Sequence, residues 1–516
     1  MRIRRFQTTA ALVALVALVA AARAQTPVVS NVAGLSGTGD PAEQTAQPRT
    51  VADCIKEIKH PTDWLNWGGD FRVRNEYYPN TVSLSKDAPL NEQDVVRYRG
   101  RLWASLTPLT NLSFNGRVAA EPRLWVKPAF TASDVGNSGM EWRYGIVDTL
   151  NVKWSNIFDQ PISLTAGRQD IMLGDYYDWW LVVDGTPDDG SWTLFLDSIR
   201  ATAEAKGIQT KFDLIYIQQN AQPDEWMPTI GSTSFVHPDL NARTDYQLTE
   251  QNEQGVVAYV SNSSIDKTKI DGYFIYKRDN RQRFERLGVT TPMGDNANIY
   301  TLGGKITGTP MENWQYSAEG AYQFGTKEDN VREDDVLTFA QRDIDAYGGK
   351  AKLTYLFNDK YNCQLSLNGE FLSGDNPKTT GKDEMFDLLW GRWPRWSELY
   401  IYSYATETSG KFAQMNNLIR FGPSWTCNPT KGLTASVTYN ALFAPEDTPT
   451  RTPSAGADAE FSKDGRFRGH YLQAVLKHQF NKNVSAHLWG EWIWEGDYYS
   501  HRDVLSFLRA EVMFSF

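Results

Sequence analysis

Residues 504–516 of this 516-residue chain read VLSFLRAEVMFSF, and they alternate in polarity to the last position. One parity carries Leu505, Phe507, Arg509, Glu511, Met513 and Ser515, and the other carries Ser506, Leu508, Ala510, Val512, Phe514 and Phe516. Successive side chains of a β-strand point to opposite faces, so this strand would have one mixed face and one largely apolar face. Such alternation, ending in an aromatic residue, is typical of the closing strand of a transmembrane β-barrel.

The same alternation recurs from Trp67 onward in segments of about ten residues. We predict eighteen strands, at 67–77, 95–107, 112–123, 144–154, 162–170, 198–205, 208–219, 255–262, 267–278, 297–308, 313–325, 343–357, 361–374, 414–425, 432–443, 467–480, 483–495 and 504–516. An even number of antiparallel strands returns both ends of a barrel to the same side of the membrane. The sequence therefore predicts an all-β, antiparallel transmembrane barrel over residues 67–516.

The connections sort by length in step with strand number. After even-numbered strands come short turns rich in turn formers, at 108–111, 263–266, 309–312, 428–431 and 481–482. After odd-numbered strands come long connections, at 78–94, 124–143, 171–197, 220–254, 279–296, 326–342, 375–413 and 444–466. Short turns on one rim and long loops on the other predict periplasmic turns and extracellular loops in an outer-membrane barrel. We therefore expect the protein in the outer membrane, with lipid around it.

The first 66 residues have no strand pattern. Residues 1–24 combine Arg2, Arg4 and Arg5 with an apolar run at 10–22 and small residues at the end, which predicts a cleaved signal peptide. Residues 25–66 are predicted to be a periplasmic tether, with a short helix near 50–58.

Composition argues against several classes of function. The formal charge of −10 becomes −14 once the four arginines of the signal peptide are removed, which disfavours a nucleic-acid partner. The six histidines have no metal-ligand spacing, and no Gly-x-Ser-x-Gly or phosphate-binding loop occurs, so we expect no cofactor, no metal and no enzyme. His501 and Asp503 could form the acid–histidine pair of an outer-membrane protease, but we expect them to be loop residues. Cys363 and Cys427 both fall at the short-turn end, where they could form a disulfide.

Arginines gather on the inward parity of the early strands and of the last one. Rows of guanidinium groups in an aqueous conduit favour anions, and interleaved acids limit how tightly an anion is held. The alternative is that these are ordinary lumen charges, paired across strands to hold the barrel's shape. The candidate conduit residues on this parity are Arg72, Arg74, Arg97, Arg99, Arg101, Arg117, Arg200, Arg420 and Arg509.

The predicted loop at 375–413 contains a dense aromatic and basic patch, Trp390, Arg392, Trp393, Arg395 and Trp396. Aromatic faces stack on sugar rings and arginines pair with uronate carboxylates, so the patch could be a saccharide gate at the outer mouth. It could equally be a cluster that packs the loop.

One segment resembles the alginate export family of outer-membrane proteins. The residues that carry the resemblance are Ala166-Gly167-Arg168-Gln169-Asp170, then Leu173-Gly174-Asp175, then Trp192, and Asp197-Ser198-Ile199-Arg200. The resemblance implies a monomeric eighteen-stranded barrel with an arginine-lined conduit, and it makes Arg168 and Arg200 conduit candidates. The chain departs from the pattern where Tyr176-Tyr177-Asp178-Trp179-Trp180 replace an expected basic residue. Strict alternation would put Arg168 on the outer face unless a bulge intervenes.

These observations lead to a functional hypothesis. We expect a channel for passive export of an anionic polysaccharide such as an alginate-like polyuronate, with a periplasmic export scaffold as a candidate partner. The alternative is a diffusion porin for uptake of small anions or oligosaccharides. An outer-membrane enzyme ranks third.

Overall fold

The computed structural model describes residues 62–129, 138–173, 181, 195–223, 226–231, 234–235, 248–286, 289–333, 336–391, 396–407, 416–447 and 460–516. The predicted signal peptide and all but the last five residues of the predicted tether lie outside these ranges.

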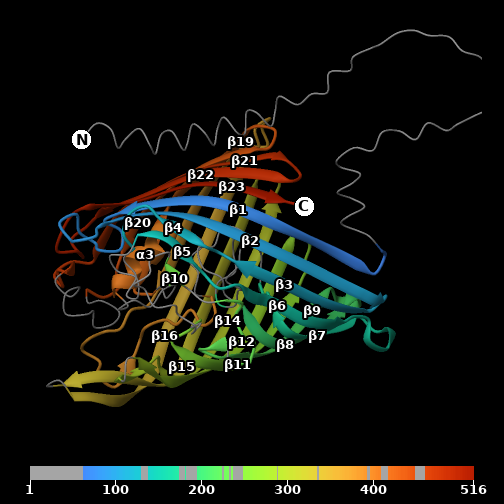
Figure 1. Ribbon diagram of the computed structural model, residues 1–516, viewed down its shortest axis with the longest axis horizontal. Coiled ribbons are helices and arrows are strands. Elements are labelled where there is room, and N and C mark those ends of the chain that lie inside the picture. The colour runs from blue at the N-terminus through green and yellow to red at the C-terminus, as the bar shows by residue number, and fades with distance from the viewer. Residues whose placement is uncertain are drawn as a thin grey trace, which may run out of the picture. The chain divides into compact units, whose positions relative to one another are not determined.

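Eighteen antiparallel strands form one closed barrel, because each pairs with the next along the chain and the last pairs with the first (Figure 1). Strand β23 pairs with β1 over eight residues, from Leu508 opposite Tyr77 to Ser515 opposite Asp70. The barrel strands are β1 (Leu65–Pro79), β2 (Glu92–Leu109), β3 (Leu112–Ala120), β6 (Ile146–Trp154), β7 (Ile162–Gln169), β8 (Leu196–Ala205), β9 (Thr210–Gln219), β11 (Gln251–Asn262), β12 (Thr268–Arg286), β14 (Asn296–Met311), β15 (Trp314–Glu333), β16 (Val336–Leu356), β17 (Gln364–Leu372), β19 (Leu418–Thr430), β20 (Leu433–Phe443), β21 (Phe467–Asn481), β22 (Val484–Glu495) and β23 (Val504–Ser515). The predicted strand number and fold class are confirmed.

The long connections hold the remaining elements. These are β4 (Arg123–Trp125), β5 (Gly139–Trp142), β10 (Ser234–Phe235), β13 (Val289–Met293), β18 (Lys382–Asp383) and the helix α3 (Glu398–Glu407). Two single-turn 3₁₀ helices, η1 (Ile157–Asp159) and η2 (Lys206–Ile208), lie in short turns. None of the helices in the described ranges is long and apolar enough to cross a membrane.

Two predicted loops are wrong in part, because the strands continue past the predicted ends. Strands β15 and β16 stay paired from Trp314 opposite Tyr355 to Glu333 opposite Val336, so most of the predicted loop at 326–342 is a β-hairpin. Strand β12 likewise runs to Arg286, inside the predicted loop at 279–296. Antiparallel neighbours satisfy each other's backbone groups whether or not lipid surrounds them, so the end of the apolar pattern does not end the pairing.

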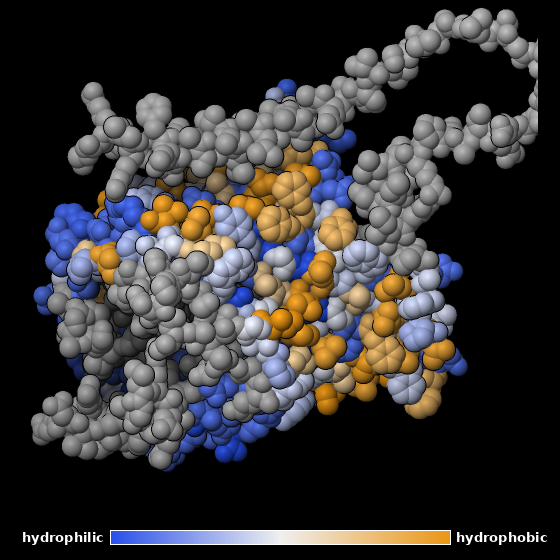
Figure 2. Space-filling model, viewed as in Figure 1, coloured by the Kyte–Doolittle hydropathy of each residue, from blue (hydrophilic) through white to orange (hydrophobic). Residues whose placement is uncertain are grey.

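The two faces of the strands separate as the alternation predicts. On the outside, Phe71, Leu102 and Phe514 are 47%, 60% and 48% exposed. Their neighbours on the other parity, such as Arg72 and Arg101, are buried or nearly so. Figure 2 shows hydrophobic side chains gathered on the outside of these strands. An apolar outer surface of this extent suits contact with lipid.

The connection between β17 and β19 folds back into the barrel. We call the described residues of this connection, 373–391, 396–407 and 416–417, the inner segment; α3 belongs to it (Figure 1). Tyr400 and Trp390 of this segment are 1% and 2% exposed, and they share one buried cluster with Tyr78 of β1 and Tyr471 of β21. The barrel interior therefore contains an apolar core made jointly by the strands and this segment.

Candidate functional site

Six of the predicted conduit arginines stand on adjoining strands. In the pairing of β1 with β2, Arg72 lies opposite Arg99, Arg74 opposite Arg97, and Asp70 opposite Arg101. In the pairing of β1 with β23, Glu76 lies opposite Arg509. Together with Arg123 of β4, we call this group the arginine wall: Arg72, Arg74, Arg97, Arg99, Arg101, Arg123 and Arg509.

Carboxylates interleave the arginine wall. The Glu76 carboxylate accepts from Arg97 at 3.0 Å and from Arg509 at 2.7 Å. Glu121, just after β3, pairs with Arg72 at 2.7 Å and also with Arg97 and Arg123. Asp70 forms ion pairs with Arg99 and Arg101, and Glu511 forms an ion pair with Arg74. Desolvation makes each buried charge dependent on its partner, so these ion pairs are mutually required.

Helix α3 adds carboxylates of its own to the barrel wall. Glu398 lies 3.0 Å from Arg509, and Glu407 receives two bonds from Arg468 of β21, at 2.5 and 3.0 Å. These ion pairs of the arginine wall link seven arginines to five carboxylates, Asp70, Glu76, Glu121, Glu511 and Glu398, of which only Glu398 comes from the inner segment.

The first turn of α3 is anchored by Glu491 of the barrel strand β22. The backbone N–H groups of Glu398 and Leu399 both donate to the Glu491 carboxylate at 3.0 Å, and the Ser397 hydroxyl donates to it as well. A carboxylate at a helix N-terminus satisfies free N–H groups and complements the helix dipole. Tyr402 stacks on Tyr78 with ring centroids 4.5 Å apart. The inner segment is therefore held by both polar and aromatic contacts.

Burial also affects an acid near the start of the inner segment. Asp375 accepts two hydrogen bonds from the Arg342 guanidinium of β16, at 2.9 and 2.7 Å. Burial and the nearby Asp383 carboxylate raise the pKa of Asp375 to about 6, against the opposing effect of Arg342. The inner segment is thus tied to β16 by a carboxylate that titrates near neutral pH.

The predicted gate residues that the structure describes are packing residues in this conformation. The Trp390 backbone donates to the Leu181 carbonyl at 3.0 Å, and its ring packs so close to Gly255 of β11 that a Cβ there would lie 2.8 Å from it. Trp396 packs on Tyr400 and Tyr471, each with ring centroids 5.0 Å away, and under the Arg420 guanidinium. Arg392, Trp393 and Arg395 lie outside the described residues.

The other predicted conduit residues lie outside the arginine wall: Arg117 and Arg200 share one cavity, and Arg420 and Arg168 lie elsewhere. Arg117 pairs with Asp148 at 2.8 Å and Asp170 at 2.7 Å, and Arg200 pairs with Asp213 at 2.8 Å. Arg117 and Arg200 line one cavity of about 670 Å³ on the inner wall, together with Lys153 and Lys211. Arg420 pairs with Glu370 at 2.6 Å.

Arg168 stands apart from these groups. It lies opposite the exposed Leu150 in the register, as strict alternation predicts. Its guanidinium pairs with Asp197 at 2.8 Å, donates to the Val147 carbonyl at 2.7 Å, and lies 3.7 Å from the centre of the Phe195 ring. The structure does not bring Arg168 into the arginine wall.

A row of alternating charge crosses six neighbouring strands. The register aligns its members directly from β12 to β19, and we call it the charge belt: Asp271, Lys305, Glu319, Lys350, Glu370 and Arg420. Opposite charges on facing positions stabilise neighbouring strands. Within the belt, Lys350 lies 3.4 Å from Glu319 and Arg420 lies 2.6 Å from Glu370.

Arg468 is a site residue that the alternation did not predict; it is fully buried and pairs with Glu407 of α3. Simple alternation puts Arg468 on the outward parity of β21. The register shifts there, because Leu442 pairs with Gly469 and Phe443 with Phe467, so Arg468 is the extra residue of a bulge. A bulge changes the direction in which a side chain points, and a glycine within a strand often marks one. Gly469, which has a φ of 140°, is therefore the sequence signal that could have indicated this bulge.

The described residues contain no group of three or more His, Cys, Asp or Glu side chains placed to hold a metal ion. Cys363 and Cys427 are both free thiols, so the disulfide that their positions allow is not formed.

Comparisons with known proteins agree with this architecture. A family model described as alginate export matches residues 63–506. A search of the curated proteins found no significant match. The fold is similar to that of OccAB1 from Acinetobacter baumannii, with a TM-score of 0.50 and 8% identity over 88% of this chain and 96% of that one. OccK2 (OpdF) from Pseudomonas aeruginosa follows with a TM-score of 0.48 and 10% identity over 87% and 97% of the two chains.

Proposed function

The chain belongs to the alginate export family and is an outer-membrane channel, and from this premise we propose that it passes an anionic polysaccharide of the polyuronate kind through an arginine-lined lumen. We propose passive export as the direction, from the short-turn end to the long-loop end. The arginine wall is the proposed selectivity element, and the inner segment is the proposed gate.

The observation that carries this proposal is the composition of the arginine wall. Its ion pairs join seven arginines to five carboxylates, and one of those five belongs to α3. Guanidinium groups recognise carboxylates in a fixed, planar geometry, which suits a polymer that presents a carboxylate on each sugar. The wall carboxylates would limit retention, so that each sugar is admitted and then released.

Glu398 indicates how a polyuronate could engage the wall. Its carboxylate occupies a place beside Arg509 that a sugar carboxylate could take. An arriving polyanion would compete with α3 for this arginine and would weaken the hold of the inner segment. Because Glu491 anchors the helix start through the backbone N–H groups of Glu398 and Leu399, we expect the Glu398 side chain to move away from Arg509 while the helix stays on the barrel wall.

A second candidate function is diffusive uptake of small anions or oligosaccharides. The observation that favours it is the packing of the inner segment against separate parts of the wall: Trp390 on β11, Tyr402 on Tyr78 of β1, and Trp396 on Tyr471 of β21. Such packing narrows the passage, and a narrow passage suits small solutes.

Block of single channels by polymers would distinguish the two functions. We expect a polyuronate to block the wild-type channel at concentrations where a neutral dextran of equal length does not, and Arg72→Gln with Arg99→Gln to weaken that block by about tenfold. Rapid passage of monomeric uronate, with polyuronate excluded from both sides, would favour the uptake porin. Equal block by the neutral dextran would contradict the proposed recognition of carboxylates.

We also propose that the channel is a monomer and that a periplasmic scaffold is its partner. The barrel closes within one chain, which supports a monomeric channel. A periplasmic scaffold that delivers polymer would meet the short-turn end, where the first strand β1 begins and the last strand β23 ends.

A further inference from the structure

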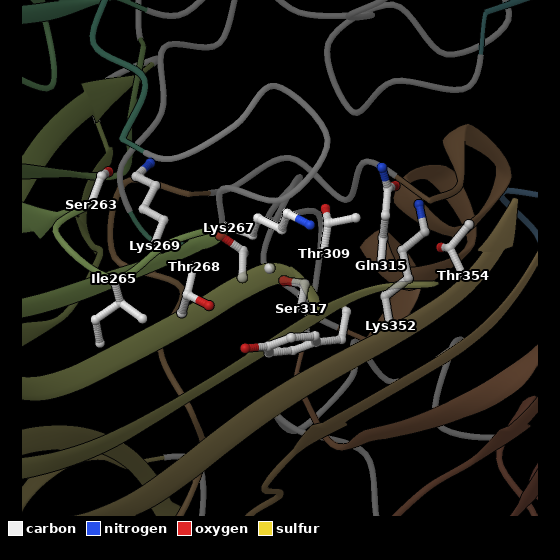
Figure 3. Close-up of a pocket in the computed structure, with 13 residues that line it drawn as sticks. Ser263, Ile265, Lys267, Thr268, Lys269, Thr309, Gln315, Ser317, Lys352 and Thr354 are labelled. Atoms are coloured by element: carbon white, nitrogen blue, oxygen red, sulfur yellow. The ribbon is translucent and has the colours of Figure 1, made fainter. Parts of the chain in front are cut away.

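A second basic region lies on the opposite side of the charge belt from the long connections. A cavity of about 420 Å³ opens on the inner face of β12, β14, β15 and β16, next to the short turn at 263–267. Its charged lining residues are Lys267, Lys269 and Lys352, and we call it the lysine pocket. Figure 3 shows these lysines and Gln315 on one side of the strands, with Ile265 pointing to the other side.

The register explains why the pocket is basic. One row nearer the short turns than the charge belt, Lys269 faces Thr307, Thr307 faces Ser317, and Ser317 faces Lys352. The acids of the belt have no counterpart in this row, and none of the residues that line the cavity is acidic. The pattern of paired charges therefore stops at the belt.

The lysines are also poorly neutralised. In the described part of the chain, Lys267 and Lys352 form no ion pair, and Lys269 has only a long contact of 3.7 Å with Asp271. An ammonium group that faces water and lacks a partner keeps its field available to a passing anion. The lysine pocket thus differs from the arginine wall, whose cations are already engaged.

We infer that the lysine pocket is a binding subsite for an acidic oligosaccharide at the short-turn mouth, where carboxylates of the incoming chain meet Lys267, Lys269 and Lys352. This inference deepens the proposed function and rests on it for the choice of a uronate-bearing ligand. The backbones of Lys269 and Lys352 are three strand spacings apart, about 14 Å, so a chain of several sugars can extend between them.

Neutral polar groups occupy the space between the lysines. Thr307, Thr309, Gln315, Ser317 and Thr354 supply hydroxyl and amide groups that can donate to and accept from sugar hydroxyls. Cations at the edges with hydroxyl-binding groups between them match a chain of sugars that carry carboxylates. The volume falls within the range of about 300 to 1,000 Å³ that is usual for small-ligand sites.

The test is protection of the lysines from an amine-acylating reagent, read by mass spectrometry on the full-length protein in detergent. A short oligogalacturonate should slow acylation of Lys267, Lys269 and Lys352 by about threefold or more at low salt, and a maltodextrin of matched length should not. Lys206, Lys431 and Lys482 are exposed lysines of other short turns, outside both cavities, and they should be unaffected. Equal rates with and without the oligogalacturonate would overturn the inference.

A second arm separates this inference from the proposed function. The triple variant Lys267→Gln, Lys269→Gln, Lys352→Gln should raise the half-blocking concentration of oligogalacturonate added at the short-turn side by about 3- to 30-fold. The charge-matched control Lys206→Gln, Lys431→Gln, Lys482→Gln should not. Block that survives in the triple variant would refute the lysine pocket while leaving polyuronate passage intact. Protection of the lysines in a channel that no polyuronate blocks would refute the proposed passage while leaving the subsite intact.

Discussion

The arginine wall and the lysine pocket are both basic, both on the inner face of one barrel, and yet they differ in almost every physical respect. The arginines of the wall are buried to within a few per cent of full burial at Arg72, Arg74 and Arg509, and each is held by carboxylates. The lysines of the pocket line an open cavity that contains no acidic residue among those described, and only Lys269 has an acid nearby, Asp271 at 3.7 Å. Paired guanidinium groups build a rigid surface, whereas unpaired ammonium groups offer a mobile and easily screened field.

The largest expected difference is in stability. Glu76→Gln should destabilise the folded barrel by about 3 to 5 kcal/mol, because Arg97 and Arg509 would keep their buried charges without this carboxylate. Glu204→Gln changes an exposed acid of the inner wall and should stay within about 0.5 kcal/mol. Urea unfolding in lipid vesicles measures the free energy of unfolding of both variants. Equal stability of the two variants would show that the arginine wall is not a mutually dependent network.

The outer faces of the two regions should behave alike. Leu508→Arg on β23 and Leu302→Arg on β14 replace side chains that are 41% and 61% exposed to the outside. Each should cost about 2 to 4 kcal/mol of assembly free energy if it lies near the bilayer midplane. Heat-modified mobility after refolding into lipid gives the folded fraction. Normal assembly of either variant would contradict the assigned lipid face of that strand.

The contact between α3 and the arginine wall should control access to Arg509. Glu398→Gln removes one carboxylate beside Arg509, so we expect polyuronate block to become about threefold tighter and conductance to rise modestly. Asp87→Asn, an exposed acid of the connection between β1 and β2, is the control and should change neither quantity. Weaker block in Glu398→Gln would indicate that α3 supports the binding surface and does not compete with the polymer.

At the long-loop end of β16, the hold on the inner segment should depend on pH. The pKa of Asp375 is raised to about 6, above its unfolded value, so its contribution to stability is fully present below about pH 4 and is lost as pH rises through about 6. Conductance noise from the inner segment should therefore increase over this window. Asp375→Asn should abolish the dependence, and its persistence in that variant would assign the titration to another group.

The smallest expected effect is that of a single pocket lysine. Lys352→Gln should shift the reversal potential slightly toward cations at about 0.01 M salt, where the Debye length is about 30 Å, and the shift should vanish near 1 M. A shift that is equally large at high salt would require a paired, buried charge at this position.

The strand number, the alternation and the lipid face could be predicted from the sequence, because a membrane barrel imposes a period of two on every strand. The same rule predicted that Arg72, Arg97 and Arg509 lie together, since closure makes the first and last strands neighbours. It failed at Arg468, where a bulge reverses the parity, and at β15 and β16, which continue as a hairpin.

The inner segment was beyond prediction for a different reason. Its contacts join residues far apart in sequence, such as Ser397 with Glu491 and Tyr402 with Tyr78, and no local period encodes them. The patch around Trp390 and Trp396 was recognised as aromatic and basic, but its packing inside the barrel depends on glycine at position 255 and on the charges of distant strands.

The most direct test of an anion-conducting lumen is the zero-current potential of the wild-type channel across a potassium chloride gradient in a planar bilayer. We expect anion preference in spite of the formal net charge of −10, because arginines outnumber their partner acids in the wall and, within the described ranges, the pocket lysines have no ion pair shorter than the 3.7 Å contact between Lys269 and Asp271. Charge reversal at Arg99 and Arg101 should move the potential toward cations. Cation preference in the wild type would contradict the account.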